Sequence, residues 1–245
     1  NNVDGIFESG ILSKFLATYS DEFYGGHYVK ELEKAFIEKF QVQHAISVNS
    51  WTSGLIIAVG CLDIEPGDEI IVPSLCYISP IHMIKLLGAI PIIADVDSNS
   101  YQICPSNIKK KISNKTKAIL MIHNFGSVCK YEDICKIADA KKIQIIEDIS
   151  ETIFSKIKNN FLGSNKSKKT QIISFSSLHS TKTITTGEGG IIFTNSNSIS
   201  ENLKNLRDHG VKKGKAYCYK QIGGNFRMSN LLASLGVAQL SKIKH

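Results

Sequence analysis

Residues Ser176–Gly190 read SSLHSTKTITTGEGG and connect two apolar runs, Ile172–Phe175 and Gly190–Thr194. Short runs of this kind, rich in β-branched and aromatic residues, are typical of buried strands. The connecting segment holds Lys182, five residues ahead of a Gly-Glu-Gly-Gly turn and among hydroxyl residues. The sequence therefore predicts two strands joined by a polar loop that fixes one lysine, a candidate nucleophilic amine.

The same kind of pattern extends along the whole chain. Apolar runs bounded by turn residues predict seven buried strands: His44–Val48, Glu69–Val72, Ile90–Ala94, Ala118–Ile122, Ile143–Glu147, Ile172–Phe175 and Gly190–Thr194. Amphipathic segments between them predict helices: Val29–Lys39, Thr52–Leu62, Pro80–Leu87, Tyr131–Ala140 and Ser198–Asp208. Strands that alternate with helices form a mainly parallel sheet. We expect one α/β domain over residues 1–245, without internal repeats or a linker.

Composition excludes few classes of protein. The net charge of +7 is compatible with an anionic partner, but it does not identify one. The densest lysines, Lys166, Lys168 and Lys169, have no interleaved aromatic residues for base stacking, so we expect a solvated surface and no nucleic acid. No apolar run approaches the roughly 20 residues that span a bilayer, so we expect no membrane partner.

The cysteines indicate a reducing compartment. Six are scattered without CxxC pairs: Cys61, Cys76, Cys104, Cys129, Cys135 and Cys218. This spacing favours neither a disulfide framework nor a zinc cluster, and we interpret the cysteines as reduced, mostly buried thiols. The N-terminus has no pattern of a secretory leader, so we expect a cytoplasmic protein. The spacing of His123 and His209 does not suggest a metal site.

Ligands of open parallel sheets bind beyond the carboxyl ends of the strands. After the first predicted strand, VNSWTSGLIIA leads small polar residues directly into a helix. Ser or Thr can cap this helix, and its N–H groups and dipole favour a phosphate. Two plainer readings stay open: the cap serves only its own helix, and Trp51 packs in the core.

Two more candidates follow other strands. Asp148, in IIEDISE, ends an apolar strand, where a carboxylate is costly unless it is paired or hydrogen-bonded. A protonated pyridine nitrogen is one such partner, and a cap on the next helix is the alternative. Tyr77, in PSLCYIS, could lie against a planar aromatic cofactor or simply pack. A phosphate cradle, a strand-end carboxylate, an aromatic platform and a lysine together match the requirements of pyridoxal 5'-phosphate.

With these features, the chain resembles the DegT/DnrJ/EryC1/StrS family of sugar aminotransferases. The resemblance extends from Gly25 to Leu240 through an ordered series of motifs: GGHYVKELEKAF, NSWTSGL, GDEIIVPS, GAIPIIADVD, TKAILMIHNFG, IIEDISE, SLHSTKTITTGEGG, LRDHG and GGNFRMSNLLASLGVAQL. It implies the three-layer α/β/α large domain of fold type I pyridoxal-phosphate enzymes. It also implies that the family's smaller C-terminal domain is missing, since the chain ends at His245.

The resemblance assigns roles around the cofactor ring. Lys182 resembles the lysine that forms the Schiff base with the cofactor, and Asp148 the carboxylate that pairs with the pyridine nitrogen. Tyr77 is similar to the aromatic residue that stacks on the ring. Glu151 occupies a position near the phenolic oxygen. His179 is a candidate for substrate contact, or a structural residue of its turn.

Other residues resemble those that hold the phosphate. Trp51, Thr52 and Ser177 match this group, and Ser176 is a rival for Ser177 because the paired serines leave the alignment ambiguous by one residue. Asn225 resembles an asparagine that reaches the phosphate of the neighbouring subunit's cofactor, which implies a homodimer with shared active sites. The plain alternative for Asn225 is a Gly-Asn turn.

The family's reaction is transamination. The resemblance implies that L-glutamate gives its amino group to the cofactor, and that a nucleotide-linked keto-sugar then accepts it for surface polysaccharide, including lipopolysaccharide, synthesis. The sugar, the aminated carbon and the nucleotide stay open. A related class dehydrates sugars with a histidine in place of the lysine, and Lys182 argues against it. A third reading is a truncated family member that binds cofactor or dimerises without turnover. The lysine-rich loop Phe161–Gln171 departs from the family, and we expect it to be mobile.

Overall fold

The computed structural model describes residues 2–15, 22–164, 167, 169–212 and 217–243. Its helices are α1 (Asn2–Ser9), α2 (His27–Phe40), α3 (Trp51–Gly60), α4 (Ser79–Leu86), α5 (Pro105–Lys111), α6 (Tyr131–Lys141), α7 (Asn197–Arg207) and α8 (Asn230–Leu240), with a short 3-10 turn at Asn124–Gly126. Its strands are β1 (His44–Val48), β2 (Glu69–Pro73), β3 (Ile90–Ala94), β4 (Thr116–Ile122), β5 (Gln144–Asp148), β6 (Lys156–Ile157), β7 (Asn160–Phe161), β8 (Ile172–Ser177) and β9 (Gly190–Thr194).

Seven strands form one sheet in the order β1-β9-β8-β5-β4-β2-β3, and β6 pairs only with β7. The pairs β2–β3, β2–β4, β4–β5 and β5–β8 are parallel, whereas β1 and β9 are antiparallel. The prediction of an α/β fold with a mainly parallel seven-stranded sheet is confirmed. All seven predicted strands and all five predicted helices are present, with ends that differ by at most two residues.

Three helices and the β6–β7 hairpin were missed. α5 has a single buried residue, Ile108, among three lysines, so its seven residues carry no apolar period. α8 has apolar and small residues on all sides, which hides the helical period. In α1 only Ile6 is buried. These helices are specified by what they pack against, more than by their own pattern.

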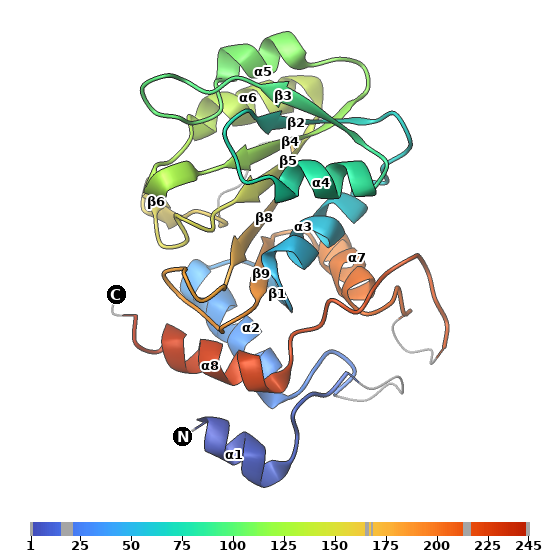
Figure 1. Cartoon of the computed structure of the whole chain (residues 1–245), viewed down its shortest axis with the longest axis vertical. Coiled ribbons are helices and arrows are strands. Elements are labelled where there is room, and N and C mark those ends of the chain that lie inside the picture. The colour runs from blue at the N-terminus through green and yellow to red at the C-terminus, as the bar shows by residue number, and fades with distance from the viewer. Residues whose placement is uncertain (1, 16–21, 165–166, 168, 213–216, 244–245) are drawn as a thin grey trace. The chain divides into compact units, whose positions relative to one another are not determined.

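The chain divides into two compact units, residues 1–57 with 177–245, and residues 58–176. In the first unit, α2 packs against β1 and α8, which lie together in Figure 1. The rings of Phe40 and Phe193 are stacked at 4.9 Å, and Phe36 meets Phe193 edge-on at 5.7 Å. A Cβ on Gly236 of α8 would lie 2.9 Å from Leu32 of α2, so the glycine permits the close approach of the two helices.

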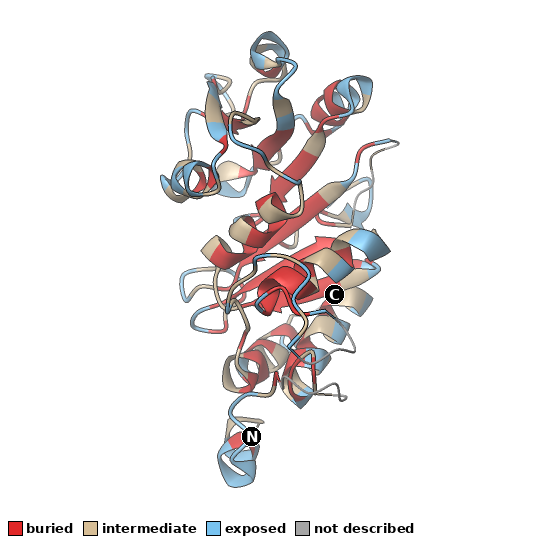
Figure 2. Cartoon of the chain, turned by 90° about the vertical axis from the view of Figure 1, so that its right-hand side faces the viewer, coloured by how far each residue is buried: buried red, intermediate tan, exposed pale blue. Residues whose placement is uncertain are grey.

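In the second unit, the parallel strands β2, β4, β5 and β8 are mostly buried, whereas Ile90 and Ile93 of β3 are exposed. Ile70 and Ile71 of β2, Leu120 of β4 and Ile146 of β5 are fully buried, as expected where helices cover a parallel sheet. α4 packs on β2 and β3, α5 on β3, and α6 on β5. Figure 2 shows the central strands coloured as buried over most of their length, while the helices alternate between buried and exposed residues.

Three expectations about the surface can be compared with the structure. All six cysteines are free, but only Cys129 and Cys135 are buried, so the expectation of mostly buried thiols is wrong for the other four. Among the described residues, no helix has the length and apolar character needed to cross a membrane. In the lysine-rich loop, residues 165–166 and 168 lie outside the described residues, whereas Ser167 and Thr170 are hydrogen-bonded to the carboxylate of Asp139.

Candidate cofactor site

The first turn of α3 has the features expected of a phosphate cradle in the first unit. Ser50 precedes the helix, and its hydroxyl accepts the N–H of Ser53 at 3.0 Å. The Ser53 hydroxyl donates to the side-chain oxygen of Asn49 at 2.5 Å. These bonds fix the backbone that leads into Trp51 and Thr52, where the positive end of the helix dipole favours an anion.

The last residue of the Gly-Glu-Gly-Gly turn, Gly190, lies too close to another backbone segment to carry a side chain. A Cβ at this position would lie 2.8 Å from the carbonyl oxygen of Ser50, a contact that real Cβ atoms do not make. The start of β9 therefore passes directly against the backbone that begins α3. Any larger residue at position 190 would displace the first turn of α3, which carries Trp51 and Thr52.

Lys182 lies in a polar loop that is hydrogen-bonded to itself. The Leu178 N–H donates to the Gly189 carbonyl at 2.9 Å, and the Thr186 N–H donates to the Leu178 carbonyl at 2.9 Å. At the tip, the Lys182 N–H donates to the His179 carbonyl at 3.0 Å. The backbone that carries the lysine is thus fixed by its own loop, as the sequence predicted.

His179 is engaged within this loop. Its Nδ1 lies 3.0 Å from the Thr181 hydroxyl, and its Nε2 lies 3.7 Å from a carboxylate oxygen of Glu188. The ring therefore contacts residues on both sides of the loop. This geometry favours the structural interpretation of His179 over substrate contact.

The two rival serines occupy the end of β8. Ser176 and Ser177 are both buried, and as consecutive strand residues they project to opposite faces. The Ser177 hydroxyl accepts the His179 N–H at 3.2 Å, which joins it to the loop of Lys182. This bond favours Ser177 as the residue that belongs with the loop.

Asn225 lies next to the start of α3 within the first unit. Its carbonyl oxygen accepts a hydrogen bond from the Asn49 side chain at 3.4 Å, and the following Phe226 carbonyl accepts the Asn49 N–H at 2.9 Å. The side-chain oxygen of exposed Asn225 accepts from Arg227 Nε at 3.0 Å. Because the oxygen is used in this way, the side chain would meet an anion through its N–H2 group.

Asp148 is the central residue of the second unit. It ends β5 with 6% exposure. Its Oδ1 accepts two hydrogen bonds from Ser150, one from the backbone N–H at 2.9 Å and one from the hydroxyl at 2.5 Å. Burial, followed by the charge of Asp148, raises the pKa of the Cys76 thiol, so Cys76 stays neutral at pH 7. The sequence predicted the carboxylate but missed Ser150.

Tyr77 and Glu151 lie on loops of the same unit. Tyr77 follows β2 and is 79% exposed, so the interpretation that it simply packs in this unit is wrong. The Leu75 carbonyl, two residues earlier, accepts a hydrogen bond from the Asn124 side chain at 2.9 Å. Glu151 accepts the N–H of Phe125 at 2.6 Å. The turn at residues 124–125 therefore connects the two loops that carry Tyr77 and Glu151.

A buried polar network lies beside Asp148 on the neighbouring strands. The Cys129 N–H donates to His123 Nδ1 at 3.0 Å, so Nε2 carries the ring proton and donates to Glu147 at 3.1 Å. Glu147 also accepts the Ser174 hydroxyl. His123 is thereby used in a hydrogen-bonded pair. Among the described residues, no group of three or more His, Cys, Asp or Glu side chains could hold a metal ion.

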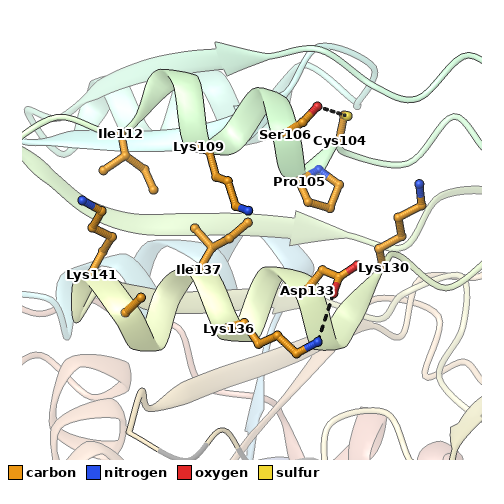
Figure 3. Close-up of a pocket in the computed structure, with 11 residues that line it drawn as sticks. Cys104, Pro105, Ser106, Lys109, Ile112, Lys130, Asp133, Lys136, Ile137 and Lys141 are labelled. Carbon is orange, nitrogen blue, oxygen red and sulfur yellow. Dashed lines mark hydrogen bonds and ion pairs between the residues drawn. The ribbon is translucent and has the colours of Figure 1, made fainter.

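A groove of about 730 Å³ lies elsewhere in the second unit, between α5 and α6 (Figure 3). Its floor is apolar, with Ile112 and Ile137, and lysines including Lys109 and Lys141 line its sides. None of the predicted site residues lines it. Its thiol, Cys104, is hydrogen-bonded at 3.1 Å to the Ser106 hydroxyl, which is not a general base, so we do not assign the chemistry to this groove.

The comparison with known sequences decides the family. The sequence model of the DegT/DnrJ/EryC1/StrS aminotransferase family matches residues 15–245. The chain belongs to this family. It is 38% identical over 217 residues to a GDP-perosamine synthase of Escherichia coli O157:H7, and 34% identical over 218 residues to one of Vibrio cholerae. The resemblance inferred from the motifs is confirmed.

Solved structures of the family have the same fold. The chain superposes on Helicobacter pylori PseC, an aminotransferase involved in the biosynthesis of pseudoaminic acid, with a TM-score of 0.86 and 28% identity. The match covers 98% of this chain and 62% of PseC. In both perosamine synthases the alignment covers 89% of this chain and 58% of the relative. The chain thus spans somewhat less than two thirds of these relatives.

Proposed function

We propose that this chain binds pyridoxal 5'-phosphate and transfers an amino group from L-glutamate to a nucleotide-linked keto-sugar. Membership of the aminotransferase family supports this proposal. The observation that carries it is Asp148, a carboxylate at the carboxyl end of a parallel strand that is only 6% exposed. A buried carboxylate forms strong charge-assisted hydrogen bonds with a cationic group, and a protonated ring nitrogen is such a group.

The donor set fits this cofactor. The first unit offers an amine on a fixed loop and a capped helix N-terminus with hydroxyl groups, and the second offers the buried carboxylate and an exposed tyrosine. When bound, pyridoxal phosphate supplies an aldehyde that accepts an amino group and a protonated ring that withdraws electrons. Lys182 would bind this aldehyde, and Asp148 would hold the proton on the ring nitrogen.

The chain's own residues then have distinct tasks. The Lys182 amine would act as the base that removes the proton from the α-carbon of the amino acid and later returns it as the acid. Tyr77 would cover one face of the ring, and Glu151 would lie near the phenolic oxygen. One carboxylate oxygen of Glu151 already accepts the Phe125 N–H, and this bond restricts the orientation of the carboxylate.

Residues of the first unit would bind the phosphate of the cofactor. Trp51 and Thr52 begin α3, whose dipole favours an anion, and Ser177 belongs to the loop of Lys182 through His179. Ser176 is the alternative to Ser177. Asn225 would donate its amide N–H2 group to the phosphate of the partner subunit's cofactor, so the proposal includes a homodimer with shared sites.

The relatives support a class of substrate. Two relatives are GDP-perosamine synthases, so we propose a GDP-linked keto-sugar as the first substrate to test. Six free cysteines support a reducing compartment, which is consistent with the cytoplasm.

Cofactor binding is tested by mixing the protein with pyridoxal phosphate and recording the visible spectrum. We expect a new band in the wild type that Lys182→Ala and Lys182→Arg both lack, since arginine keeps the charge but cannot form the bond. Lys169→Ala, an exposed lysine of the same unit as Asp148, serves as control. Reduction with borohydride and peptide mapping should label position 182. A saturated protein without label there refutes the proposal.

Amino transfer is tested with glutamate and a series of keto-sugar nucleotides. Formation of 2-oxoglutarate together with an amino-sugar nucleotide, absent in Lys182→Ala, supports the aminotransferase. Release of a dehydrated sugar without an amino group would indicate the dehydratase chemistry instead. Cofactor binding without either product would indicate a chain that binds cofactor but does not turn over.

A further inference from the structure

We infer that Ser150 is a positioning residue: its hydroxyl and its backbone N–H together hold the Asp148 carboxylate ionised and oriented for the cofactor's ring nitrogen. The inference rests on the proposed function, because it assigns Asp148 to that nitrogen. It adds a residue that acts through Asp148 and need not contact the ring itself.

The geometry places both donors of Ser150 on one oxygen. The backbone N–H lies 2.9 Å and the hydroxyl 2.5 Å from Oδ1 of Asp148. Both residues are 6% exposed, so water competes little for these bonds. A carboxylate has two equivalent oxygens and rotates about its last bond. Two donors that converge on Oδ1 restrict this rotation, and they fix the direction in which Oδ2 points.

The electrostatic effect of the two bonds has a definite sign. A neutral donor stabilises the ionised form of a carboxylate, which lowers its pKa, whereas burial raises it. The titratable residues near Asp148 within this unit include Cys76 after β2, His123 after β4 and Glu147 on β5. Cys76 is neutral at pH 7, and the His123 ring is paired with Glu147, while its backbone N–H donates to the Asp148 carbonyl. Ser150 thus supplies two donors to the Asp148 carboxylate, and both oppose the effect of burial on its pKa.

Ser150→Ala removes the hydroxyl and leaves the backbone bond in place. One neutral hydrogen bond changes an equilibrium constant by about fivefold, so we expect the Kd for pyridoxal phosphate to rise about fivefold. The acid-side midpoint of the visible spectrum should rise by about 0.7 pH units, since Asp148 then takes up a proton more readily. Ser150→Thr keeps a hydroxyl and should restore both values. Ser155→Ala, five residues further along, is the matched control.

A cofactor-free readout separates this inference from the proposed function. Carbon-13 NMR of the Asp148 carboxyl follows its titration in the chain without cofactor, and the pKa should be higher in Ser150→Ala than in the wild type or Ser150→Thr. Circular dichroism of each variant verifies that it is folded.

A raised Asp148 pKa with weakened cofactor binding, both restored by threonine, supports the inference. Unchanged values in a folded Ser150→Ala variant overturn it, and so does a raised pKa without any change in cofactor affinity. If the wild type binds no pyridoxal phosphate, the proposed function fails and the positioning role fails with it, while the NMR titration still reports whether the hydrogen bond to Asp148 exists.

Discussion

Replacing Arg207 by methionine should strongly destabilise the first unit. Arg207 is fully buried, and its guanidinium donates to Glu33 at 2.6 Å, to the Ser47 carbonyl at 3.0 Å and to the Tyr24 carbonyl at 3.4 Å. Its partner Glu33 has a side chain that is 12% exposed. Methionine fills much of the same space, so the variant removes the charge and its bonds with a limited change in volume.

The loss of stability depends on the Glu33 carboxylate, which stays partly buried without its cationic partner. Removing one partner of a buried ion pair costs about 3–5 kcal/mol, because the other charge is left uncompensated. Glu33 still accepts the Ser47 N–H at 2.9 Å and the Ser47 hydroxyl at 2.8 Å, which relieves part of that cost. We therefore expect the low end, about 3 kcal/mol, or a fall in Tm of roughly 6–12 °C for a chain of this size.

Arg207→Met, Glu33→Gln and the double variant form a double-mutant cycle. Glu33→Gln keeps a side-chain oxygen that can accept from the Ser47 donors. The double variant should lose about 2 kcal/mol less than the sum of the two single variants. Trp51 is the only tryptophan and belongs to the first unit, so its fluorescence during urea unfolding monitors the relevant part of the chain. A loss below about 1 kcal/mol for Arg207→Met, or strict additivity in the cycle, would refute the reasoning.

Further predictions concern packing, thiols, acid titration and the glycine turn. Phe193→Ala should cost about 3–5 kcal/mol in urea unfolding followed by Trp51 fluorescence, because its ring contacts Phe36 and Phe40; an effect on the scale of a surface mutation would contradict this. In alkylation at neutral pH followed by mass spectrometry, Cys104 should react first, since its bond with Ser106 lowers the pKa of this thiol, while burial raises the pKa of Cys61 and Cys135 to about 12. Although burial opposes the shift, hydrogen bonding from Ser167 and Thr170 lowers the pKa of Asp139 below 3.8. The stability that these bonds contribute is therefore present above pH 3.8 and is lost as the pH falls through the lower pKa of the folded state. The Thr170 amide NMR signal should shift over that pH range in the wild type and stay constant in Asp139→Asn. Gly190→Ala should weaken pyridoxal phosphate binding and destabilise the chain by about 1–3 kcal/mol, because its Cβ would lie 2.8 Å from the Ser50 carbonyl; unchanged binding in titrations would count against our view of the cradle.

Much of the candidate site could be predicted from the sequence, because its residues follow strands that are recognisable as apolar runs. The run IIE ahead of Asp148 identifies a buried strand, and parallel sheets bind ligands at that end. The cap before α3 was visible in the same way. Ser150 was missed, because a serine two residues after an aspartate has no distinctive pattern, and its meaning depends on the turn that brings both its donors to Oδ1.

The sequence by itself determined the seven strands, the amphipathic helices and the residues that carry chemistry, because apolar period and turn composition are local properties. Only the tertiary structure decided that β9 runs antiparallel to β1, that α8 is a helix beside α2, and that Glu33, Ser47 and Arg207 form one buried network across more than 170 positions of sequence. The physical reason is that strand pairing, the close approach at Gly190 and the compensation of a buried charge are properties of two segments at once. Neither segment encodes them alone.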